Sequence, residues 1–233
     1  RKSMLKKLLT VGLALTMMFA VTACSSKDSD SDKPNDNNTS DNTKQERPFT
    51  ESNGLIKYFT INDEKIPLPE TVGEYVKYLE KIGTKVELGD TGKSVDEAPK
   101  VDASGISSMV AYLKVYLDDS DWQWFGIRYK NDTDKKQSVA DCKVTQITLD
   151  YDTITEEENH HGIKSTVFIT NADQEIPMDG KTKSSNLLKW IGSPQQNTDG
   201  HWHYTDDQGY KYEFVTENQK GILTRVAITY PTN

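Results

Sequence analysis

The chain has 233 residues, 34% of them apolar, and a formal net charge of −8 at pH 7. With a mean hydropathy of −0.72, this composition leaves room for one hydrophobic core and excludes a bundle of membrane-spanning helices. The first 24 residues carry four bases and no acid, and residues 25–50 carry four bases and six acids, so residues 51–233 carry −10. Because phosphate binding needs clustered Lys and Arg, this acidic region without a basic stripe excludes nucleic acid as the partner.

Residues 1–23 are predicted to be a lipoprotein signal peptide. The basic segment "RKSMLKK" precedes 16 uncharged residues, which is short of the roughly 20 that span a membrane. Cys24 then follows Val-Thr-Ala, a pattern that resembles the lipobox of bacterial lipoproteins. The resemblance implies that Cys24 becomes the first mature residue and carries a diacylglyceryl group with acyl chains such as palmitate. Two acyl chains anchor a protein stably. The alternative is an ordinary secretion signal with an unmodified cysteine.

Residues 24–50 are predicted to be the lipidated cysteine and a disordered tether. No large apolar residue occurs in residues 25–48, so this stretch cannot bury enough surface to offset the entropy of ordering it. A flexible chain of that length spans roughly 25 to 30 Å. Its Ser-rich composition is similar to that of Gram-positive lipoproteins, which implies the extracytoplasmic face of the cell membrane.

Strand and helix patterns begin near Lys57. Alternating apolar residues predict a strand over 57–62, a turn, and a short extended return over 66–69. Thr71 with Glu74 forms a capping box, and helical spacing continues until Gly83. A long polar loop is expected next, over residues 84–105. Three strands are expected after it, at residues 106–118, 121–130 and 142–151.

The same order of elements is predicted again from Ser165. A strand, a turn and a shorter helix that ends at Gly192 precede three further strands, at residues 201–205, 210–215 and 222–230. Phe59 matches Phe168 at the same spacing that relates Asn62 to Asn171. This ordered set of matches predicts an internal duplication. The alternative is two similar strand-helix segments within an ordinary α+β domain.

The expected fold class is α+β. Each copy, over residues 51–155 and 156–233, is expected to pack a helix on an antiparallel β-meander preceded by a short hairpin. The helix end "WIGSP" at 190–194 and the meander that follows resemble the repeat of the beta-lactamase-inhibitor-protein-like fold. They are also similar to the outer-membrane assembly lipoproteins of the SmpA/OmlA type. Those families bind other proteins, so the resemblance implies a binding module without catalytic residues.

The strand at 121–130 carries the candidate binding residues, Trp122 and Trp124. Alternation places both on one face, opposite Phe125, Ile127 and Tyr129. One face is expected in the core. An exposed tryptophan pair would form a platform for sugar rings or a protein contact, whereas burial of both faces is the alternative.

Catalytic and metal chemistry have weak support. His160 and His161 form one pair, and His201 and His203 share a strand face at a spacing that could chelate a metal, but nothing in the sequence brings the pairs together. Cys142 has no partner once Cys24 is lipidated, so we expect a small buried hydrophobic residue. We predict no metal, no cofactor and no enzymatic activity.

The sequence therefore favours a membrane-anchored extracytoplasmic lipoprotein that binds a protein, a peptide or an envelope polymer. The alternatives are a solute-capturing lipoprotein of a transporter and a metal-dependent envelope protein that uses the histidine pairs. A deep polar cleft would favour solute capture, converging histidines would favour a metal, and a shallow aromatic concavity would favour protein binding.

Overall fold

The computed structural model describes residues 52, 54–103, 109–117, 122–151, 166–217 and 220–232. The signal peptide, the tether and Cys24 lie outside these residues, as do His160, His161 and the expected boundary between residues 155 and 156. Within the described residues the chain forms twelve strands and two helices: β1 Ile56–Ile61, β2 Glu64–Pro67, α1 Val72–Leu79, β3 Lys85–Leu88, β4 Met109–Tyr116, β5 Trp122–Lys130, β6 Lys143–Asp150, β7 Thr166–Thr170, β8 Glu175–Met178, α2 Ser184–Ile191, β9 Gln196–Thr198, β10 His201–Thr205, β11 Lys211–Thr216 and β12 Leu223–Thr229.

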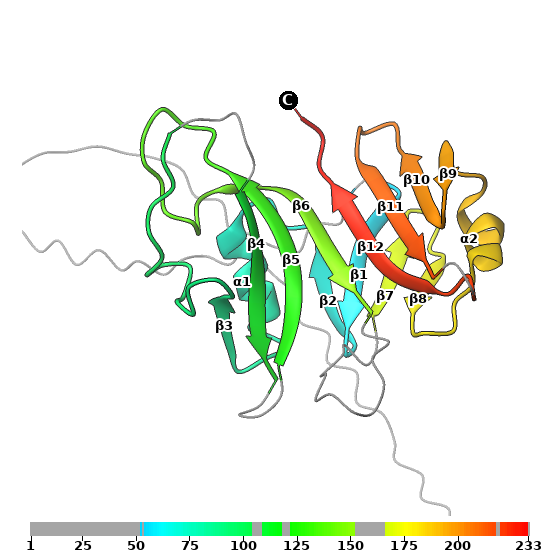
Figure 1. Ribbon diagram of the computed structural model, residues 1–233, viewed down its shortest axis with the longest axis horizontal. Coiled ribbons are helices and arrows are strands. Elements are labelled where there is room, and N and C mark those ends of the chain that lie inside the picture. Colours follow the sequence, from blue (N-terminus) through cyan, green and yellow to red (C-terminus); the bar gives the residue numbers. More distant parts are fainter. Residues whose placement is uncertain are drawn as a thin grey trace, which may run out of the picture. The chain divides into compact units, whose positions relative to one another are not determined.

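The strands form two antiparallel sheets (Figure 1). The large sheet has the strand order β3-β4-β5-β6-β12-β11-β10-β9, and the small sheet has the order β2-β1-β7-β8. The order of two strands, a helix and four strands occurs twice along the chain. Both sheets join the two halves at their centres, through β6 with β12 and through β1 with β7.

The α+β fold class expected from the sequence is wrong, because the described chain is mostly β. Each helix has eight residues, so it covers only about 12 Å of sheet. The meanders do not form separate layers, each with its own helix, because β6 pairs with β12 into one continuous sheet. The hairpins expected merely to precede the helices pair with each other and supply a second sheet.

The core lies between the large sheet on one side and the small sheet with the helices on the other. Phe59 and Phe168, which the sequence comparison matched, are cross-strand partners at the centre of the small sheet, with ring centroids 5.9 Å apart. Both are fully buried, as are Phe125, Ile147 and Phe214 from the large sheet. The described residues belong to one compact unit, Arg47–Asn233.

The start of α1 is confirmed and its length is shorter than predicted. The Thr71 hydroxyl accepts a hydrogen bond from the Glu74 amide at 3.2 Å, which is the N-cap interaction that the sequence predicted. The helix ends at Leu79, before Gly83, and packs on the large sheet through Tyr75, whose ring meets that of Phe125 edge to face. Gly83 lies so close to β4 that a Cβ there would collide with Val115.

Two strands of the large sheet were not predicted. β3 lies inside the segment expected to be a loop, where it pairs with β4. β9 pairs with β10 across a two-residue turn at Asp199 and Gly200, both with positive φ. Positive φ at both central residues is the requirement of a tight hairpin, and Asp-Gly is among its preferred sequences.

Candidate functional site: the open face of the large sheet

One face of the large sheet packs on the core, and within the described chain no helix or strand covers the other (Figure 1). We call this second face the open face. Because side chains alternate along a strand, its members are every second residue of each strand. At its centre they are Val110, Tyr112, Lys114, Trp124, Gly126, Arg128, Gln146, Thr148, Asp150, Arg225, Ala227, Glu213, His201 and His203.

An aromatic wall lines the β4–β5 side of the open face. It consists of Tyr112, Lys114, Tyr116, Trp122 and Trp124. The Trp122 and Trp124 ring centroids lie 4.9 Å apart at 78°, and the ammonium of Lys114 lies 4.5 Å from the Trp122 ring centroid. These contacts fix the rings before any partner arrives. Tyr112 is nevertheless 53% exposed and Trp124 37% exposed.

Gly89 is what lets Trp124 lie across the sheet. The residue follows β3, and its amide donates to the Tyr112 carbonyl at 2.7 Å. A Cβ on Gly89 would collide with the six-membered ring of Trp124. The position of this ring therefore depends on a glycine that is distant in sequence.

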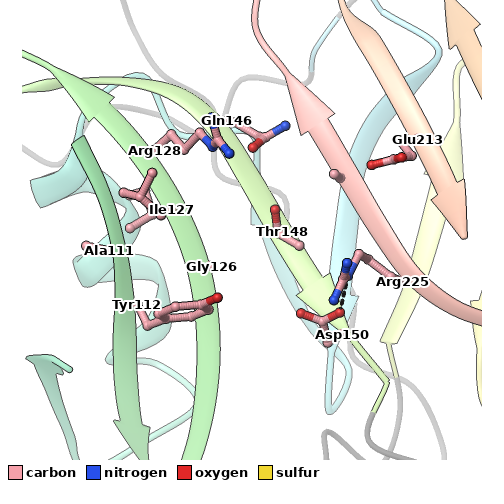
Figure 2. A pocket seen from close by; sticks show the side chains of 12 residues that line it. Ala111, Tyr112, Gly126, Ile127, Arg128, Gln146, Thr148, Asp150, Glu213 and Arg225 are labelled. Atoms are coloured by element: carbon pink, nitrogen blue, oxygen red, sulfur yellow. Dashed lines mark hydrogen bonds and ion pairs between the residues drawn. The ribbon is translucent and has the colours of Figure 1, made fainter. Parts of the chain in front are cut away.

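A shallow hollow lies beside the aromatic wall, above the junction of β6 with β12 (Figure 2). Its floor is made by three small cross-strand neighbours, Gly126, Thr148 and Ala227. Tyr112 and Glu213 flank the floor in the same register row, four strand spacings or about 19 Å apart between their Cα atoms. The hollow measures about 260 Å³, below the roughly 300 to 1,000 Å³ of pockets that enclose small molecules.

The two guanidinium groups of the hollow differ in their surroundings. Arg225 forms an ion pair with Asp150, its cross-strand neighbour (Figure 2). Arg128 is exposed and makes no hydrogen bond or ion pair within the described residues. The side chain of Gln146, its neighbour in register, donates to the Thr229 hydroxyl at 2.8 Å. The hollow thus has one paired cation and one unpaired cation.

His201 and His203 lie on the open face of β10, as their alternation predicted. The Nδ1 atom of His201 is 2.7 Å from a Glu213 carboxylate oxygen, and Nε2 of His203 is 3.9 Å from the same oxygen. Among the described residues, no group of three or more His, Cys, Asp or Glu side chains is placed to hold a metal ion. His160 and His161 lie outside the described residues.

Cys142 is fully buried in the core and donates its thiol hydrogen to the Ser138 carbonyl at 3.3 Å. Burial, with smaller contributions from Asp141 and Asp132, raises the pKa of Cys142 to about 11. The thiolate is the nucleophilic form of cysteine, so at neutral pH this group is unreactive.

Sequence reasoning found part of the open face. It named Trp122 and Trp124, which the structure places outward, while Phe125, Ile127 and Tyr129 lie in the core. It did not name Tyr112 or Lys114, although the alternation of "VAYLKVY" over 110–116 carried that signal. It also missed Arg128, because an isolated arginine on a strand shows no pattern until the neighbouring strands are known.

Comparison of the chain with protein-family models, characterised proteins and solved structures gave no match. The resemblance to the beta-lactamase-inhibitor-protein-like repeat and to the lipobox therefore stays a prediction. The helices that the structure describes are all too short or too polar to cross a membrane.

Proposed function

We propose that this chain is a membrane-anchored extracytoplasmic lipoprotein that binds a protein partner through the open face. The observation that carries the proposal is the exposed aromatic wall beside a shallow hollow. Protein interfaces are enriched in Tyr, Trp, Met and Arg. Three of these residue types gather here, as Tyr112, Trp124 and Arg128, all of them exposed. No catalytic residues are assigned.

The shape of the hollow favours this proposal over capture of a solute. A transported solute would need enclosure, whereas the hollow is small and lies on a sheet face. A partner's side chain needs only a shallow depression, surrounded by contacts that exclude water. The distance of about 19 Å between Tyr112 and Glu213 leaves room for a loop or for one helix, whose diameter is about 10 to 12 Å.

The anchor is tested at Cys24. Cells that express the chain with Cys24 are expected to incorporate labelled palmitate into it and to retain it in the membrane fraction. Cys24→Ser should abolish the label and release the protein, because the thioether link needs the thiol. Equal labelling of both forms would contradict the lipobox interpretation.

The open face is tested by affinity capture with the lipidated full chain, purified in detergent and incubated with solubilised envelope. Tyr112→Ala and Trp124→Ala are each expected to lower recovery of the specific partner by about tenfold or more, since truncating an interface anchor costs roughly 1.4 kcal/mol or more. Leu188→Ala is the matched control, because Leu188 is 44% exposed but lies on α2.

Thermal unfolding of each variant separates loss of binding from loss of folding. Unchanged recovery with both open-face variants, or equal loss with Leu188→Ala, would reject the open face as the binding surface. The partner recovered by the native chain and by the control should be the same protein.

A further inference from the structure

We propose that the occupant of the open face is an acidic protein segment, with a carboxylate bound by Arg128 at the edge of the hollow. This inference rests on the proposed function and adds the chemistry of the partner. It depends on the unpaired state of Arg128, the small residues of the floor, and the charge of the open face relative to the rest of the chain.

Arg128 offers donors that the described protein does not use. A guanidinium has five N–H donors in a planar fork that matches a carboxylate with two parallel hydrogen bonds. Arg225 already uses its guanidinium to bind Asp150. Arg128 has no hydrogen-bonding or ionic partner in the part of the chain that the structure describes. The free guanidinium is therefore the group to which an incoming anion adds most.

The floor of the hollow gives a side chain access to Arg128. Gly126 lies two residues before Arg128 on β5, and a Cβ on it would come within 3.0 Å of the Thr148 side chain. Because Gly126 has none, the space above the floor stays open. Thr148 adds a hydroxyl that can donate to the second carboxylate oxygen.

The part of the open face around the hollow has a charge opposite to that of residues 51–233 as a whole. Residues 51–233 carry −10, so an acidic partner is repelled by most of the surface. In the three register rows that cross the hollow from β4 to β11, bases outnumber acids. The bases are Lys114, Arg128, Lys211 and Arg225, and the acids are Asp150 and Glu213. Such complementarity directs encounter and orientation.

Glu213 on the far side of the hollow orients the occupant. Its carboxylate repels another acid on that side, and it is engaged by His201. The aromatic wall on the near side accepts apolar parts of a partner. An acidic side chain with an apolar neighbour therefore fits Arg128 and the aromatic wall together, which favours a protein segment over a polymer that is uniformly polar.

The test is selection of a random peptide library displayed on phage against the detergent-solubilised full chain, without counter-selection, after which the affinity of each selected peptide is measured for the native chain, Arg128→Gln and Tyr112→Ala. We expect the selected peptides to be enriched in Asp and Glu relative to the starting library and to bind Arg128→Gln at least tenfold more weakly. Arg128→Lys should restore binding in part, because lysine keeps the charge but loses the fork. Lys189→Gln removes an exposed base from α2 and should bind as the native chain does.

Peptides without acidic enrichment, or peptides that bind Arg128→Gln equally well, would overturn the inference. Three alternative occupants would also overturn it if their binding depended on Arg128. They are acidic oligosaccharides on an array when no peptide is selected, a synthetic peptide of residues 25–48, and a second copy of the chain. Peptides that depend on Tyr112 but not on Arg128 would leave the proposed function standing and remove only the acidic partner. Peptides that depend on neither residue would remove both.

Discussion

Raising the pH above about 10 is expected to unfold the chain cooperatively, because several buried tyrosines cannot ionise in the folded state. Burial raises the pKa of Tyr75 and Tyr230, whose hydroxyls are enclosed without a hydrogen-bond partner among the described residues. Burial also raises the pKa of Tyr212, whose hydroxyl donates to Asp206 at 2.7 Å, and raises the pKa of Tyr204 to about 12.

The free energy of unfolding falls as the pH rises above 10, because the unfolded chain then binds fewer protons than the folded chain. A tyrosine in the unfolded chain loses its proton near pH 10, whereas the buried one keeps it. Its contribution to stability is therefore complete below pH 10 and is lost as the pH rises toward the folded pKa. Above pH 10 each such tyrosine lowers the free energy of unfolding by about 1.4 kcal/mol per pH unit. Three of them together would remove a typical stability of 5 to 15 kcal/mol within a few pH units.

Phenolate absorbance and far-ultraviolet circular dichroism measured on the same samples should change together in one steep step. A gradual rise of phenolate absorbance near pH 10 with unchanged secondary structure would contradict the expectation. Tyr75→Phe is the matched variant. It removes one buried hydroxyl that has no hydrogen-bond partner in the described part of the chain. It should therefore raise the free energy of unfolding at pH 7 by about 1 kcal/mol and make the alkaline step less steep.

Local sequence patterns predicted the individual strands well where a single face is aromatic. The alternate positions of Trp202, Tyr204, Tyr210, Tyr212 and Phe214 in the sequence predict one aromatic face, and all of them are buried except Tyr210, which is partly buried. The fold class could not be obtained in this way. The pairing of β6 with β12 joins residues about 75 positions apart, such as Asp150 and Arg225, and no local periodicity encodes that register.

The two strands that were not predicted, β3 and β9, were missed for different reasons. β9 was detectable, because Asp199-Gly200 is a strong signal for a tight turn between two strands. β3 was not, because its four residues include Lys85 and Glu87, which form an ion pair with each other although Glu87 is buried. A short edge strand with charged residues reads as a polar loop in the sequence.

The candidate site was predictable only in its aromatic part. Tryptophans at alternate positions of one strand indicate a shared face whatever the neighbouring strands are. Arg128 can be recognised as a candidate binding residue only when Gln146, Thr148 and Arg225 are seen to line the same hollow. Sequence alone assigns such a residue to an ordinary solvated surface.

Replacing Phe125 by alanine is expected to lower the free energy of unfolding by about 3 to 5 kcal/mol, since the ring is fully buried at the centre of β5. The change also removes the edge-to-face contact with Tyr75, whose ring centroid is 6.3 Å away. Because Trp124 and Gly126 flank Phe125 on the same strand, the aromatic wall and the floor of the hollow depend on this core position.

Chemical denaturation at pH 7 measures the effect, with two controls on the large sheet. Phe125→Leu keeps most of the volume and should cost less than about 1.5 kcal/mol. Val110→Ala, at a side chain that is 61% exposed, should change stability by less than about 0.5 kcal/mol. A loss below 1 kcal/mol for Phe125→Ala would mean that β5 is not held by this core. The open face would then lack the rigid support that fixed rings at Trp122 and Trp124 require.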